Sequence, residues 1–188
     1  MKNSRTEKIT IIDSVIKRIW KEDLSRDYNN GFLLKEGSMK NAFYFHLRHR
    51  LGEVFLLNNN LRIFTEFHME GQRVDLVIVE INPDLIWKES LEDCVIDIVA
   101  TIEMKFKGQG VNDSPFYKDI EKVIQYINGW GVNTKHYLAF IQEKYFIKDE
   151  ITSWLSDEQI NSSKGKLVEL YSYWDNETDE SEWIVKEY

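Results

Sequence analysis

Cysteine, proline and long apolar segments are scarce in this chain of 188 residues. Cys94 is the only cysteine, so no disulfide can form within the chain, and a lone thiol fits a reducing cytoplasm. The two prolines, Pro83 and Pro115, fall where we place loops. No segment approaches the roughly eighteen consecutive apolar residues of a membrane span, and the first ten residues contain no apolar signal region. We therefore expect a cytoplasmic protein that does not contact a membrane.

Several enzyme signatures are missing as well. The sequence has no glycine-rich phosphate loop, no Ser-His-Asp signature and no Cys-His pair with local support. His46 and His49 are three residues apart, but no cysteine or acidic residue nearby completes a zinc set. We interpret both histidines as solvated residues or phosphate contacts.

The composition predicts one folded domain, residues 1–188, because 43% of the residues are hydrophobic and 13% are aromatic. The net charge of −8 is unusual for a nucleic-acid-binding protein, since affinity for phosphate comes largely from Lys and Arg. Acidic residues crowd the segment 175–188, however, and basic residues cluster in the middle of the chain. A local basic face on an acidic protein is therefore compatible with the sequence.

Hydrophobic periodicity predicts an α/β fold with a central mixed β-sheet flanked by helices. Helical spacing covers an N-terminal helix at 5–24, a second helix from the N-cap Ser38 to about Leu57, a helix from Ser114 to Gly129 and a short helix near 149–155. Strand patterns cover 61–68, 73–81, 94–106, 136–142 and a C-terminal strand pair at about 166–186.

Two acidic residues interrupt apolar strands and therefore stand out. Asp75 lies within a run of Val, Leu and Ile, and Glu103 lies within the next strand along the chain. A carboxylate is rarely buried without a partner, and a divalent cation is one such partner. Because Glu103 and Lys105 are two residues apart, they point to the same face of their strand. The backbone carbonyl of Met104 is positioned to complete a metal shell.

These residues resemble the signature of the PD-(D/E)xK nuclease superfamily, which has a restriction-endonuclease-like fold. The matching residues run in the family's order over a core of about 36–142: Glu36 at a helix start, Arg73-Val74-Asp75, Glu103-Met104-Lys105, the helical Asp119-Ile120-Glu121-Lys122, and the strand Tyr137–Ile141. The resemblance implies a restriction-endonuclease-like sandwich in which Asp75 and Glu103 bind Mg²⁺, for which Mn²⁺ substitutes. It also implies that Lys105 assists the nucleophile and that Glu36 tunes the metal site.

The sequence departs from the family pattern in two places. Val74 stands where the signature has proline, and the excursion Asn82–Asp93 lengthens the spacing between Asp75 and Glu103. Glu66 is a rival to Glu36 for the accessory role because it precedes Asp75 on the neighbouring strand. The plain structural alternatives are an ion pair of Asp75 with Arg73 or Arg62 and a surface ion pair between Glu103 and Lys105.

The function we expect is that of a Mg²⁺-dependent nuclease, a DNA endonuclease in restriction, defence or repair. Lys107, Lys118 and Lys122 are the expected nucleic-acid contacts, joined by Arg48 or Arg50, with the acidic C-terminal hairpin away from them. Cleavage of both strands implies a homodimer or a partner subunit. Two alternatives stay open: a non-catalytic module of the same fold that binds a protein or nucleic-acid partner, and a nuclease acting on RNA. Because like charges crowd the metal-free site, we expect removal of Asp75 to leave the fold intact or slightly stabilised.

Overall fold

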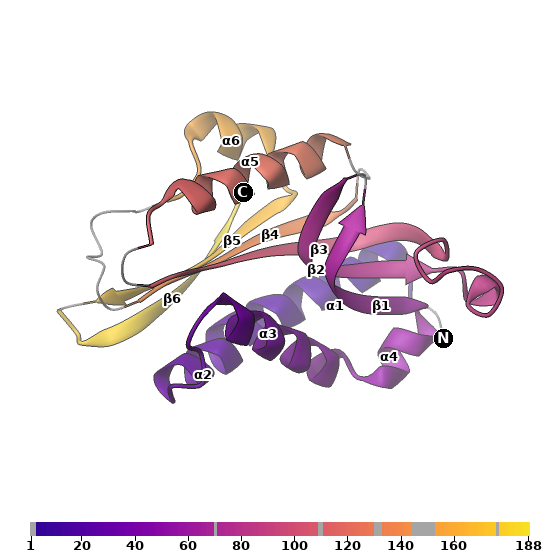
Figure 1. The fold of residues 1–188 in the computed structure, drawn as a ribbon, viewed down its shortest axis with the longest axis horizontal. Helices are drawn as coiled ribbons and strands as arrows, with labels where there is room; N and C mark the ends of the chain where they lie inside the picture. The colour runs from indigo at the N-terminus through magenta and orange to yellow at the C-terminus, as the bar shows by residue number, and fades with distance from the viewer. Residues whose placement is uncertain (1–2, 70, 109–110, 130–132, 144–152, 176) are drawn as a thin grey trace.

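A computed structural model describes residues 3–69, 71–108, 111–129, 133–143, 153–175 and 177–188. Its six strands form one mixed sheet in sequence order (Figure 1). Strand β4 pairs in parallel with both β3 and β5, and the other neighbouring strands are antiparallel. The strands are β1 (Leu61–Met69), β2 (Gln72–Ile81), β3 (Val95–Lys107), β4 (Lys135–Gln142), β5 (Leu167–Asp175) and β6 (Glu180–Glu187).

Helices cover both faces of the sheet, as Figure 1 shows. One face packs on α1 and α3 through a core that includes Ile16, Phe43 and Met104. The other face packs on α5, whose apolar stripe includes Phe116 and Val123. The α-helices are α1 (Arg5–Arg18), α2 (Ser25–Asn29), α3 (Glu36–Leu51), α4 (Glu53–Asn58), α5 (Ser114–Gly129) and α6 (Asp157–Ser162). The predicted α/β architecture, a mixed sheet flanked by helices, is confirmed.

Both predicted N-terminal helices are interrupted. The first is α-helical to Arg18, continues as the π-helix η1 (Ile19–Leu24) and then as α2. The second starts at Glu36, so the prediction of Ser38 as N-cap is wrong. Ser38 lies inside the helix, where its hydroxyl accepts hydrogen bonds from the N–H groups of the two residues before Glu36. This second helix ends at Leu51, because Gly52 takes φ 74°, a conformation incompatible with a helix.

The short helix predicted near 149–155 falls mostly outside the described residues. Residues 153–155 are described and are not helical, and α6 follows them. The excursion after β2 contains the single 3₁₀ turn η2 (Pro83–Leu85). Within the described ranges, no helix is long and apolar enough to cross a membrane.

The sheet forks between β2 and β3. Pairing of these two strands stops at Leu76 and Ile102, whereas β2 continues beside β1 and β3 continues beside β4. Glu66 on β1, opposite this point, has φ 53° and is missing from the otherwise regular pairing of β1 with β2. The fork places Asp75 and Glu103 just beyond Leu76 and Ile102, the last residues through which β2 and β3 pair with each other.

Candidate metal centre

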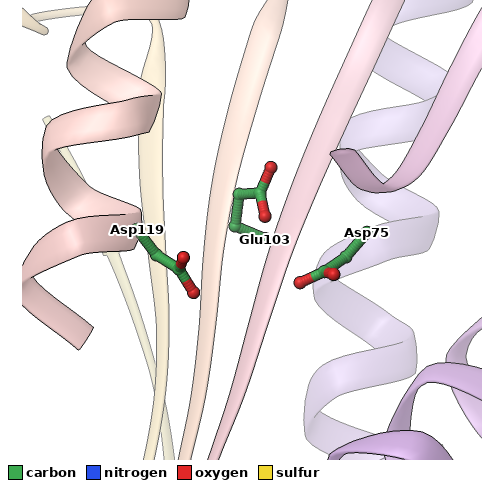
Figure 2. Close-up of side chains that lie close together, drawn as sticks. All are labelled: Asp75, Glu103 and Asp119. Atoms are coloured by element: carbon green, nitrogen blue, oxygen red, sulfur yellow. The ribbon is translucent and has the colours of Figure 1, made fainter. Parts of the chain in front are cut away.

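Three carboxylates from three elements meet at the fork. Asp75 on β2, Glu103 on β3 and Asp119 on α5 each offer one carboxylate oxygen, and these oxygens lie within 4.8 Å of one another. Figure 2 shows the three side chains pointing toward a shared space. Asp75 and Glu103 are therefore brought together as the sequence predicts. Asp119 joins them although the sequence did not assign it a role.

Asp75 is buried and doubly held. Its Oδ1 accepts a hydrogen bond from Lys40 Nζ at 2.9 Å, and its Oδ2 accepts one from the backbone N–H of Met104 at 2.8 Å. Burial alone would raise the pKa of Asp75, but these two hydrogen bonds, together with the positive charges of Lys40 and Lys105, outweigh burial and lower the pKa. Asp75 is thus an ionised carboxylate at neutral pH. Met104 contacts it through the N–H rather than through the carbonyl.

Glu103 is 1% exposed and lies under α5. Lys122 Nζ donates to Oε2 at 2.7 Å, and the Tyr126 hydroxyl donates to Oε1 at 3.2 Å. Burial, together with the negative charge of Asp75, raises the pKa of Glu103 to about 8, and the Lys122 ammonium only partly opposes this. In the absence of a metal ion, Glu103 therefore loses its proton only near pH 8, and above that pH it is the anionic partner of Lys122.

Lys105 links the carboxylate cluster to the start of α3. Its Nζ lies 3.1 Å from Asp119 Oδ2 and 3.2 Å from Glu36 Oε2. Burial would lower the pKa of Lys105, but these two acids raise it, so the ammonium stays charged. Asp119 Oδ2 is a buried atom whose contact with Lys105 is too poorly aligned to count as a hydrogen bond. This oxygen has a lone pair available to a cation.

Glu66, the alternative to Glu36 as the accessory acid, lies next to Lys40, whereas Glu36 lies next to Lys105. Its carboxylate forms ion pairs with Lys40 and with Arg73, the latter with Nε at 2.9 Å. Both accessory candidates therefore contact a lysine of the site: Glu36 contacts Lys105, and Glu66 contacts Lys40. Neither is among the three acids that converge.

The predicted nucleic-acid contacts lie in three different environments. Lys107 is 5% exposed and forms an ion pair with Asp113 at 2.5 Å, so its ammonium does not face solvent. Lys118 is exposed. Lys122 lies in the site itself, bound to Glu103. Of these three residues, Lys118 is the one with an exposed side chain, so the local basic face expected from the sequence is not formed by all three.

The two arginines proposed for the same face are engaged by acids. Arg48 forms an ion pair with Glu53, and Arg50 forms ion pairs with Asp23 and Glu22. Because β3, β4 and β5 are parallel, the turn after β5 leaves the sheet at the end where β3 also ends. The acidic hairpin and Lys107 therefore both lie at that end of the sheet.

Sequence reasoning missed Asp119 and Lys40 as members of the cluster. A signal for Asp119 exists: Asp119, Lys122 and Tyr126 recur at helical spacing and form a polar stripe that faces Glu103. Lys40 gives no such signal, because it is 35 positions from Asp75 and reaches it only through the packing of α3 on the sheet. Comparisons with protein-family models, with curated proteins and with solved structures found no match.

Proposed function

We propose that this protein is a Mg²⁺-dependent nuclease that hydrolyses phosphodiester bonds, and that it acts in the cytoplasm as a DNA endonuclease of restriction, defence or repair. The observation that carries the proposal is the convergence of Asp75, Glu103 and Asp119, with the ammonium of Lys105 beside them. The order of the elements around them, from α3 through β4, supports membership of the PD-(D/E)xK superfamily and a restriction-endonuclease-like fold.

The donor set suits a hard divalent cation. Mg²⁺ takes oxygen ligands at about 2.1 Å in octahedral geometry, so two oxygens bound to one ion lie roughly 3–4 Å apart. The carboxylate oxygens here lie within 4.8 Å of one another, so side-chain movements of about an ångström would close the shell. The poorly satisfied oxygen of Asp119 favours the same assignment.

Each residue of the site has a separate chemical role in this proposal. Asp75, Glu103 and Asp119 would hold the Mg²⁺ ion, which would supply polarisation of the phosphate and a lowered pKa of bound water. Lys105 is fixed between Glu36 and Asp119, which suits it to orient the attacking water or to neutralise charge on the phosphate. The N–H and C=O of one residue in an extended strand point to the same edge, so the Met104 carbonyl faces the side on which its N–H binds Asp75. We keep that carbonyl as a further proposed ligand.

The alternative is a non-catalytic module of the same fold that binds a protein or nucleic-acid partner. Two observations favour it: the net charge is −8, and each of the three acids already lies within ion-pair distance of a lysine. A cluster arranged in this way is compatible with a purely structural role. Cation binding separates the two candidates.

The test is nicking of supercoiled DNA with Mg²⁺ or Mn²⁺, compared with the same reaction in EDTA. We expect cleavage by the wild type and a loss of at least about a hundredfold in Glu103→Gln, since removing a metal ligand removes most of the electrostatic stabilisation. Glu121→Gln is the matched control, because Glu121 is an exposed acid on the same helix as Asp119. A wild type that cleaves equally well in EDTA, or not at all, contradicts the proposal.

A further inference from the structure

Each carboxylate of the cluster holds a different lysine. Asp75 pairs with Lys40 of α3, Glu103 with Lys122 of α5, and Asp119 with Lys105 of β3. All three ammonium groups are largely shielded from water, with side-chain exposures of 12%, 21% and 19% in that order. A divalent cation entering the cluster would therefore meet three positive charges already beside its ligands.

The three lysines differ in which acidic partners they would keep after a cation bound the three carboxylates. Lys40 also pairs with Glu66, and Lys105 also pairs with Glu36, so both keep an acidic partner. Lys122 has one ion pair within the described part of the chain, that with Glu103. It also lies 5.8 Å from the ring of Tyr126 and interacts electrostatically with Asp119, which is itself a member of the cluster. Lys122 is thus the ammonium that a cation would leave without an anion.

An ammonium released in this position needs an external anion. A charged group in a partly dehydrated setting is stabilised by an opposite charge far more than the same group in water. Lys122 is 21% exposed, so it can reach solvent without leaving the site. The phosphodiester backbone supplies such an anion beside the cation.

We propose that Lys122 couples the two ligands of this site, so that divalent cation and nucleic-acid backbone bind cooperatively. The cation takes Glu103 from Lys122, and the freed ammonium binds a backbone phosphate. This inference rests on the proposed metal site. Coupling of this kind is reciprocal: the phosphate raises cation affinity by the same factor by which the cation raises phosphate affinity. Lys122 is thereby a substrate-binding residue in the loaded site and a competitor of the cation in the empty one.

The measurement is the affinity for Mn²⁺, followed by the electron paramagnetic resonance of the free ion at pH 8.5, with and without a short DNA duplex. A blank containing duplex alone corrects for Mn²⁺ bound to the DNA, and the duplex is checked for integrity at the end. For the wild type we expect the duplex to tighten Mn²⁺ binding by about tenfold or more, within the usual five- to 150-fold range of coupled sites.

Lys122→Met is the decisive variant. It should bind Mn²⁺ alone more tightly than the wild type, since the competing charge is gone, and the duplex should change its affinity by less than about threefold. Lys122→Arg should retain the coupling, which keeps the test available if the methionine variant fails to fold. Lys164→Met, at an exposed lysine outside the cluster, should behave as the wild type.

The outcomes separate this inference from the proposed function. If Mn²⁺ binds and the binding is lost in Glu103→Gln, but Lys122→Met keeps the wild-type affinity and coupling, the metal site stands and the role of Lys122 is overturned. If the wild type binds no Mn²⁺ in either condition, both fall. Coupling in the wild type that disappears in Lys122→Met supports both.

Discussion

The carboxylate of Asp75 accepts a hydrogen bond from the backbone N–H of Met104 at 2.8 Å, just past the last paired residues of β2 and β3. A side chain thus takes the place of the next backbone hydrogen bond across the fork. Asp75 therefore links β2 to β3 at the fork in addition to belonging to the cluster of three carboxylates. Its structural role changes what its removal should do.

Replacement of Asp75 by alanine should destabilise the protein by about 1–3 kcal/mol, because it leaves a buried N–H without an acceptor and Lys40 without one of its acids. This reverses the expectation from sequence that relief of charge crowding would stabilise the fold. Asp75→Asn should cost less, because an amide oxygen still accepts from Met104. Chemical denaturation of both variants without metal gives the comparison, and an alanine variant as stable as the wild type would contradict the role assigned here.

Asp119 should be required for cation binding as strictly as Glu103. Asp119→Asn removes the charge while keeping the shape of the side chain, so we expect Mn²⁺ affinity to fall by tenfold or more, as for Glu103→Gln. Isothermal titration with Mn²⁺ measures this, with Glu121→Gln as the control on the exposed face of α5. An Asp119→Asn variant that binds Mn²⁺ with the same affinity as the control would show that Asp119 is not a ligand of the cation.

Cation binding should be pH-dependent in one direction. The pKa of Glu103 is raised to about 8, so below that pH a cation must displace a proton from this carboxylate. Mn²⁺ affinity should therefore rise with pH, by at most about tenfold per unit, and level off above pH 8. Titrations with Mn²⁺ from about pH 6.5 to 9, at constant ionic strength, measure this dependence. A Mn²⁺ affinity that falls as the pH rises would contradict the prediction.

The same raised pKa affects stability. The metal-free folded protein binds a proton at Glu103 that the unfolded chain releases near the ordinary carboxyl value of 4.5. This contribution to stability is present below about pH 4.5 and is lost as the pH rises through 8. The free energy of unfolding of wild type relative to Glu103→Gln should decrease over that interval.

The left-handed backbone at Glu66, with φ 53°, predicts a difference between two substitutions that both remove its carboxylate. Glycine tolerates this conformation, whereas alanine carries a Cβ that makes it unfavourable by about 1 kcal/mol. Glu66→Gly should therefore be more stable than Glu66→Ala by roughly that amount. Urea denaturation of the pair measures the difference, and a more stable alanine variant would show that the backbone there is not strained.

Local pattern explains the parts of this molecule that the sequence predicted. The alternation along β3 places Glu103 and Lys105 on one face, and the apolar stripe of α5 fixes which face of that helix is buried. These features depend on side-chain spacing within one element. The apolar surroundings of Asp75 likewise revealed a carboxylate in need of a partner.

The missed features depend on contacts between elements. The partner of Lys105 is not Glu103 but the pair Glu36 and Asp119, which come from two helices on opposite faces of the sheet. The burial of Lys107 goes with its ion pair to Asp113. Periodicity within a strand does not predict this contact, because Asp113 lies outside the strand. The pairing of each lysine with its acid depends on the fork between β2 and β3, and no local sequence pattern predicts this fork.

Crystals of the wild type grown with millimolar Mn²⁺ test whether the three carboxylates bind a cation, because anomalous scattering locates the ion without reference to activity. We expect a peak at the fork within about 2.2 Å of a carboxylate oxygen from each of Asp75, Glu103 and Asp119, with Lys122 moved off Glu103. A map with no peak at the fork, and with the three lysines still paired to the three acids, would contradict it.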